Sequence, residues 1–447
     1  MRFCIYHTAI FCTLHFHSSC MSDLDSSPRV IVCFGPGPRF KGGIQNYNTS
    51  LALALDKKPG TKVHIVSWTQ QYPAIVPREF VDKSSKTDLL AGSHVEVHYV
   101  TNYNRPSTWF ETVRLIQSLK AEKVIIQWSI ALQGLPLRFI AKRLAKMGIQ
   151  VIFDLHFVIQ KENSSIDKFF TRLALPHATG YIVHALKTWD ELRALFPNAH
   201  LHLSHDGLPA GEGKMVIKLF HPIYDLFKPN DAFDTEAFKR EQGLRKHVFL
   251  FFGFIRKYKG LHHTLEAFAK VAQQRDDVSL LICGESFWHT LDQNKWSTRI
   301  KNIIFGFAKK IFLAGKDDEK NYRPLELINT LGIKDRCVVF NTFIPNEDVH
   351  KYFQVSDAVV LYYLTATPSG IESLSYNFKL PILATSVGHF PETIQDGFNG
   401  YLAKAGDIDD MAKQMLRYIH EPLPRENVAL ATAQMSWANY AEAILKT

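Results

Sequence analysis

The sequence contains no apolar run of about eighteen residues, so we expect no membrane-spanning helix. It has no zinc-ligand spacing and no basic repeat interleaved with aromatic residues, so nothing points to a nucleic acid as partner. The Gly-x-Gly-x-x-Gly spacing of a dinucleotide-binding fingerprint is also missing. The six cysteines form no Cys-x-x-Cys pair, and we interpret them as reduced thiols in a reducing compartment.

What is present is the composition of an ordinary globular protein. Hydrophobic residues make up 46% of the chain and charged residues 21%. A chain of 447 residues is long for a single core, which predicts two or three domains. The net charge of +9 indicates an anionic partner without specifying its chemistry.

The N-terminal segment differs from the rest of the chain. Residues 1–20 resemble a secretory signal only loosely, because histidines and threonines interrupt the apolar stretch and no small-x-small cleavage site is present. Met21 begins a more typical N-terminus. We therefore expect residues 1–28 to be an unstructured extension.

Strand and helix patterns alternate along both halves of the chain. Short apolar runs predict buried strands, and apolar residues that recur every three or four positions predict helices. In the first half the expected strands are 29–35, 62–68, 123–128, 150–156 and 180–185, and the expected helices include 42–55 and 135–146. In the second half the expected strands are 248–254, 279–285, 336–343, 358–364 and 380–386, with a helix over 261–274. Gly, Pro and charged residues between about 205 and 245 predict a linker.

This alternation is typical of α/β domains built on parallel sheets. We expect two doubly wound, Rossmann-like domains, over residues 29–220 and 221–425, that face each other across a cleft. Residues 426–447 predict a C-terminal helix that crosses back to the first domain. Open sheets of this kind bind ligands beyond the carboxyl ends of their strands, so the residues that follow the strands are the candidates for a site.

The most informative of these segments is 248–260. An apolar run ends at Gly253, Arg256 and Lys259 follow on a short turn, and a helix begins after Gly260. Such a turn presents cations and backbone N–H groups to a phosphate. The alternative is an ordinary strand–turn–helix whose lysines are solvated.

Two other helix starts offer backbone N–H groups to an anion. Gly42 and Gly43 lie where a strand turns into a helix, and glycine lets the backbone approach a phosphate, although a plain tight turn remains the alternative. Ser369 and Glu372 have the spacing of a capping box, so Glu372 either caps the helix or contacts a ligand. Ser369 and Gly370 are the stronger candidates, because backbone donors at a helix start bind anions whatever the side chain.

Taken together, four features resemble the retaining glycosyltransferases of family 4, which have the GT-B architecture. They are Gly42-Gly43-Ile44, the turn Gly253 to Gly260, and the segments 344–363 and 367–402. The resemblance covers most of the chain from about residue 29. It implies transfer of a hexose-type sugar from a nucleotide diphosphate donor, with retained configuration, no metal and no cofactor. It further implies that the first domain binds the acceptor and the second the donor.

The resemblance also implies roles for individual residues. The positions that match catalytic residues are Arg256, Lys259 and His156, and those that match donor-binding residues are Gly42, Gly43, Gly253, Ser369, Gly370, Ile371, Glu372 and Glu392. A cation beside the departing diphosphate would stabilise its developing charge. His156 lies at a strand end, and the alternative for it is a purely structural role. Lys161 and Glu162 are weaker candidates for a functional role nearby. Glu392 is otherwise a turn carboxylate.

This chain departs from the family pattern in three places. Phe254 stands where the family often has an arginine, and Arg256 is the expected replacement. Ala366 and Leu374 stand where the family commonly has two glutamates, which suggests a variant subset of the family. The loss also leaves open a catalytically inactive relative that binds nucleotide sugars.

A basic segment suggests a further partner. Residues 295–316 carry six basic residues and no acidic one, beside an apolar stripe at helical spacing, which suits an anionic membrane surface. The alternative for this segment is a helix that packs on its own domain. An alternative for the whole protein is a peripheral membrane scaffold without enzymatic activity. By analogy with the family, we expect a cytoplasmic enzyme of envelope polysaccharide or glycolipid synthesis, peripheral on the inner face of the plasma membrane, acting on a glycan or lipid-linked acceptor. The sugar, the base and the acceptor stay open.

Overall fold

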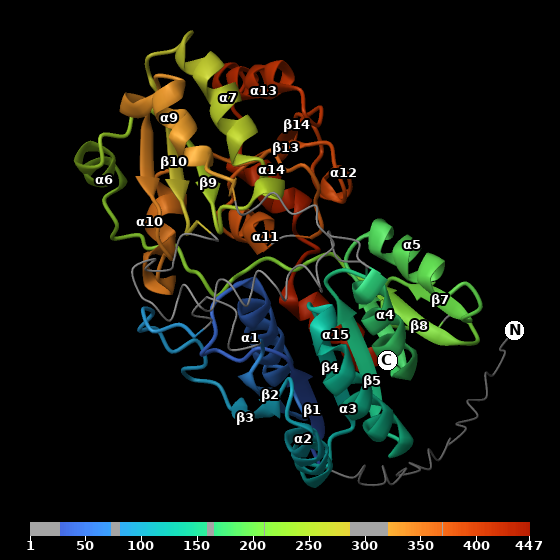
Figure 1. Cartoon of the computed structure of the whole chain (residues 1–447). Coiled ribbons are helices and arrows are strands. Elements are labelled where there is room, and N and C mark those ends of the chain that lie inside the picture. Colours follow the sequence, from blue (N-terminus) through green and yellow to red (C-terminus); the bar gives the residue numbers. More distant parts are fainter. Residues whose placement is uncertain (1–26, 73–80, 159–164, 210, 287–320, 369) are drawn as a thin grey trace, which may run out of the picture.

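The computed structural model describes residues 27–72, 81–158, 165–209, 211–286, 321–368 and 370–447. They form two separate parallel sheets, each with helices packed on it (Figure 1). The expected α/β class with two Rossmann-like domains is confirmed. Several residues discussed above lie outside the described part of the chain: three of the six cysteines (Cys4, Cys12 and Cys20), Lys161, Glu162, Ser369 and the basic segment 295–316.

The first sheet has the strand order β3-β2-β1-β4-β5-β6-β8-β7. Its strands are β1 (Arg29–Phe34), β2 (Thr61–Gln70), β3 (Glu96–Asn102), β4 (Lys123–Trp128), β5 (Gln150–Leu155), β6 (Gly180–Val183), β7 (Leu201–Ser204) and β8 (Lys214–Lys218). Its helices are α1 (Gly43–Asp56), α2 (Pro106–Ser118), α3 (Gly134–Lys146), α4 (Ser165–Ala174) and α5 (Leu186–Leu195). Successive side chains of a strand point to opposite faces. In β1, Ile31 therefore packs in the cluster that contains α1, whereas Val32 packs in the cluster that contains α2 and α3.

The second sheet has the order β11-β10-β9-β12-β13-β14. Its strands are β9 (His247–Phe252), β10 (Val278–Cys283), β11 (Cys337–Phe340), β12 (Ala358–Leu361), β13 (Ile382–Thr385) and β14 (Gly400–Ala403). The helices after β8 are α6 (Thr235–Glu241), α7 (Leu261–Ala272), α9 (Leu327–Thr330), α10 (Val349–Gln354), α11 (Gly370–Asn377), α12 (Phe390–Thr393), α13 (Ile408–His420), α14 (Arg425–Ala431) and α15 (Trp437–Lys446). Buried residues of α7 and α13 pack on one face, and those of α10 and α11 on the other.

The prediction of a linker from about 205 to 245 is wrong in part. Strand β8 lies in this segment and inserts between β6 and β7, and α6 follows it. Only three residues, Met215 to Ile217, lie between two lysines in β8, so its apolar run is too short to be recognised from the pattern. Strand β3 was also missed, because only its last two residues are buried.

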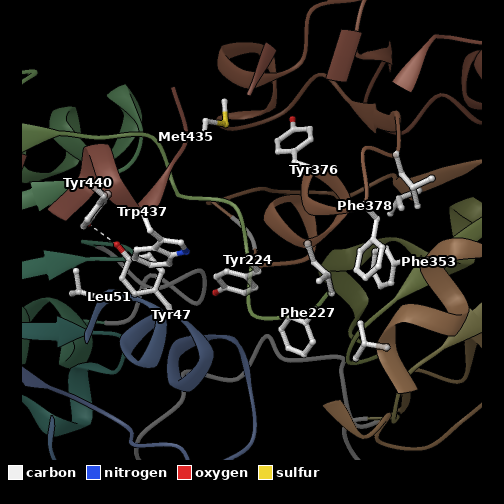
Figure 2. Packing of buried hydrophobic residues seen from close by; sticks show 14 of the residues in the cluster. Tyr47, Leu51, Tyr224, Phe227, Phe353, Tyr376, Phe378, Met435, Trp437 and Tyr440 are labelled. Atoms are coloured by element: carbon white, nitrogen blue, oxygen red, sulfur yellow. Dashed lines mark hydrogen bonds between the residues drawn. The ribbon is translucent and has the colours of Figure 1, made fainter. Parts of the chain in front are cut away.

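The C-terminal helix α15 packs on α1 of the first domain (Figure 2). The Tyr47 hydroxyl donates to that of Tyr440, and the Tyr440 hydroxyl donates to Asp154 Oδ2 at 3.1 Å. His184 Nε2 lies 2.7 Å from the other oxygen of Asp154. A buried polar network therefore ties α15 to the first sheet, while the domain limits at residues 220 and 425 stay predictions.

Tyr440→Phe tests this network. The change removes a hydrogen bond to a buried carboxylate, and we expect the free energy of unfolding to fall by about 1.5–3 kcal/mol. Denaturant unfolding measures it, with Tyr103→Phe at the end of β3 as the control, for which a change within about 0.5 kcal/mol is expected. Equal losses in the two variants would show that the Asp154 contact contributes nothing specific.

In the described part of the chain, Cys33, Cys283 and Cys337 are free thiols. Within the same residues, no helix combines the length and the apolar character needed to cross a bilayer.

Candidate functional site

A cleft of about 280 Å³ lies between the two sheets. Most of its lining residues come from five segments, 40–46 after β1, 252–259 after β9, 284–285 after β10, 342–349 after β11 and 363–374 after β12, and Asp82, Tyr224 and Phe227 complete the wall. Each segment begins at or just beyond the carboxyl end of a parallel strand, where open α/β sheets bind ligands. The two facing sheets therefore converge on one site.

Lys259 is the buried cation of this cleft. Its side chain is 7% exposed, and among the described residues no carboxylate forms an ion pair with it. Burial, and to a smaller extent the charge of Arg256, lowers the pKa of Lys259 to about 7. A buried lysine that has no anionic partner in the described part of the chain is poised to accept one from a ligand.

Two glycines make this placement possible. Gly253 has φ of +92°, and a Cβ there would lie 3.0 Å from Lys259 Nζ, so the ammonium lies directly over the end of β9. Gly260 has φ of +65°, and a Cβ there would lie 1.9 Å from the carbonyl oxygen of Tyr362. The turn predicted from the sequence thus needs glycine at both ends.

The first residues of two helices also border the cleft. Gly42 precedes α1, which begins at Gly43, and has no side chain to cap the helix; Gly370 and Ile371 begin α11. Tyr224 lies between these helix starts: its hydroxyl donates to the Gly43 carbonyl at 2.9 Å, and its ring packs against Gly370. The backbone N–H groups of a helix's first turn have no partner within the helix, so such starts favour an anion.

Arg256 lies beside the cleft and is not among the residues that line it. Its guanidinium carbon is 5.3 Å from the centre of the Tyr258 ring. It is close enough to lower the pKa of Lys259 electrostatically. The structure therefore brings Arg256 near the lysine without placing it in the cleft wall.

Glu372 also lies outside the cleft lining. Its buried carboxylate accepts hydrogen bonds from Tyr376, at 3.1 Å, and Thr393, and pairs with His389. Burial opposes its ionisation, but His389 and the two hydroxyls outweigh that cost and hold the pKa of Glu372 below its usual value. These contacts use both of its oxygens within the second domain.

Glu392 joins the two domains. Its carboxylate accepts from the backbone N–H of Leu186 at 3.2 Å and lies 3.5 Å from Lys218 Nζ. It does not line the cleft. These contacts favour a bridging role for Glu392 over the donor contact that the resemblance implied.

His156 is buried in the first domain and does not line the cleft. Its Nε2 lies 2.8 Å from Gln127 Oε1, and its ring meets the Tyr47 ring edge-on at 4.7 Å. Burial lowers the pKa of His156 to about 4, although the charge of Asp154 opposes this. The imidazole is therefore neutral at pH 7 and belongs to the network below α1.

Several residues of the cleft wall were not singled out from the sequence. Lys41 reaches across from the first domain, with Nζ 4.7 Å from the centre of the Phe343 ring. Among the described residues, Asp82 and Glu285 are the acidic ones in the wall, whereas Leu374 contributes an apolar side chain. Lys41 precedes Gly42 and Glu285 follows β10, so their positions after strands were the available signal.

Comparison with known proteins gives the site its context. Residues 233–435 match the family model described as "Glycosyl transferases group 1". The D-inositol 3-phosphate glycosyltransferase of Mycolicibacterium smegmatis is 33% identical over 27% of this chain and 28% of its own. The lipopolysaccharide 1,2-N-acetylglucosaminetransferase of Salmonella typhimurium is 21% identical over 58% of this chain and 70% of its own. The chain spans about half or less of the length of the first three curated relatives it matches.

Solved structures resemble the chain over nearly its whole length. Anabaena Alr3699/HepE in complex with UDP is 14% identical, with a TM-score of 0.61 over 94% of this chain and 98% of its own. The same protein has also been solved with UDP-glucose. Residues 233–435 are therefore similar to a glycosyl transferases group 1 domain, and the chain shares the two-domain GT-B fold of these solved structures.

Proposed function

We propose that this chain transfers a sugar from a nucleoside diphosphate donor bound in the cleft. The observation that carries the proposal is Lys259, a buried cation at the point where the starts of α1 and α11 face each other. A diphosphate there would meet one ammonium and two sets of backbone donors. The UDP and UDP-glucose complexes of a protein with the same fold support a donor of this class.

The chemistry follows from where charge develops. When the sugar leaves the diphosphate, negative charge grows on the phosphate oxygens, and preorganised donors lower the barrier. We propose that Lys259 stabilises this charge, with Arg256 adding to the local positive field and Gly42, Gly43, Gly253, Gly370 and Ile371 shaping the phosphate pocket. Transfer with retention, without a metal ion and without a protein nucleophile is part of the proposal. The departing phosphate would help to deprotonate the acceptor on the same face.

The side chains of His156, Glu372 and Glu392 take supporting roles in this proposal. Each has hydrogen-bonding partners within the protein and lies outside the cleft lining. We propose that they hold α1, α11 and the domain interface in place. We propose that Glu285 in the cleft wall accepts a hydrogen bond from a hydroxyl of the donor.

The acceptor and the cellular role are proposed by analogy. A relative that acts on lipopolysaccharide supports a glycan or lipid-linked acceptor in envelope synthesis. We propose a cytoplasmic enzyme, peripheral on the inner face of the plasma membrane. The basic segment 295–316 is the sequence-based reason for the membrane contact.

Thermal shift against UDP, GDP and ADP, followed by their sugar conjugates, tests the donor site. We expect one diphosphate at about 100 times its Kd to stabilise the protein by about 2.7 kcal/mol, and the matching nucleoside to stabilise it by only about 0.4 kcal/mol at the same concentration. A binding-only relative would give the same shift without hydrolysing or transferring the sugar. If no diphosphate raises the melting temperature, the donor site is refuted.

A further inference from the structure

A cluster of two histidines and a glutamate lies on the edge of the first sheet. Strand β3 is the edge strand and pairs in parallel with β2, with His64 opposite Glu96. His98 follows Glu96 by two residues, so its side chain leaves the same face of β3. The register thus brings His64, Glu96 and His98 together on one face.

The three side chains present one ligand atom each toward a common point. His64 Nδ1 lies 3.2 Å from His98 Nε2 and 3.4 Å from Glu96 Oε2, and the last two atoms are 3.9 Å apart. Two ligands held about 2.1 Å from a tetrahedral ion are about 3.4 Å apart. The cluster therefore has the size of one face of a tetrahedral coordination shell.

From this geometry we propose that His64, Glu96 and His98 bind a divalent ion of the zinc class. Two imidazoles and one carboxylate are a donor set that Zn²⁺ uses, and the fourth position would be filled by water. His64 is 1% exposed, whereas Glu96 is 52% exposed, so the ion would enter from the solvent side of Glu96. Lys62 Nζ lies 3.3 Å from Glu96 Oε1, which leaves Oε2 directed at the histidines.

Binding of an ion would hold the edge strand β3 to its neighbour β2. Strand β3 has β2 as its neighbour in the sheet, and its first residue is Glu96. An ion held by one ligand from β2 and two from β3 would join the strands where the pairing begins. The site lies at the amino end of β3 and shares no residue with the cleft wall, so it is independent of the proposed transfer reaction.

Zinc titration of the full chain, purified without a histidine tag, tests the site. We expect calorimetry to show one tight site per chain, and Co²⁺ in its place to give the visible absorption of a low-coordinate complex. Glu96→Gln and His98→Gln should each weaken the site by about 100-fold or more. His94→Gln is the matched control, since it removes a 93% exposed imidazole two residues from Glu96 and should leave the affinity unchanged.

The outcomes separate the site from adventitious binding. Because Glu96 and His98 are partly exposed, their variants should fold, and circular dichroism verifies this. Zinc should raise the melting temperature of the wild type and of His94→Gln, but not that of His98→Gln. Wild-type affinity no tighter than that of His98→Gln, or an equal loss in His94→Gln, would overturn the proposal.

Discussion

Lys259→Met is expected to lower kcat/KM for sugar transfer, or for slow donor hydrolysis, by about 100- to 1,000-fold. Methionine is unbranched like lysine and one heavy atom shorter, so it keeps most of the cleft wall filled, but it removes the buried Lys259 ammonium beside the proposed diphosphate. The loss should appear in kcat as well as in KM, because the missing contact strengthens when the diphosphate departs. Steady-state kinetics with the donor identified by thermal shift measures it.

Lys257→Met is the control, since it removes an equal charge two residues away in the same turn. We expect its kcat/KM to stay within about threefold of wild type. Because burial of a charge is costly, Lys259→Met should be as stable as wild type or more stable. Equal losses in the two variants, or an unfolded Lys259→Met protein, would contradict a specific role for Lys259.

The affinity for the donor is expected to fall as the pH rises. The pKa of Lys259 in the free protein is about 7, below its usual 10.5, and a bound diphosphate favours the charged form. Above about pH 7 binding must therefore take up a proton, so affinity falls by up to tenfold per pH unit until the pKa of the complex is reached. Between about pH 6 and about pH 8.5 we expect a loss of about 10- to 30-fold.

The low pKa of Lys259 also makes the stability of the protein depend on pH, and stability rises where donor affinity falls. A lysine whose folded pKa is lowered is deprotonated in the folded state before it is in the unfolded state, so the unfolded chain binds more protons between about 7 and 10.5. Wild-type stability should gain from this group as the pH rises through that window, and Lys259→Met should lack the gain.

For the pH dependence of donor affinity, a nucleotide sugar is the ligand to titrate, because its diesterified diphosphate does not change charge over this range. If Lys259→Met keeps the wild-type pH dependence of affinity, another group causes it.

The fold was predictable where its strands are continuous apolar runs. Strands β1 and β9 each contain five consecutive apolar residues, and the pattern identified both. Strand β8 was missed because lysines flank it, and β3 because one neighbour leaves most of it half-exposed. The sequence pattern reports runs of buried apolar residues, so the half-exposed edge strand β3 and the short apolar run of β8 both give a weak signal.

The site was predictable where the backbone determines it. Glycines at positive φ and the lysine between them form a local motif, and Gly253, Lys259 and Gly260 lie where the turn predicted them. The roles of His156, Glu372 and Glu392 could not be predicted, because they depend on partners distant in the chain. Glu392 meets Lys218 from the other domain, and His156 meets Gln127 from the next strand.

Calorimetric titration of a nucleoside, its monophosphate and its diphosphate into wild type and Lys259→Met tests the diphosphate site most directly. We expect the diphosphate to bind wild type about 100-fold more tightly than the nucleoside, a difference of about 2.7 kcal/mol. In Lys259→Met this advantage should shrink to about tenfold or less. If nucleoside and diphosphate bind wild type equally, or if the variant keeps the full advantage, the cleft does not hold a diphosphate at Lys259.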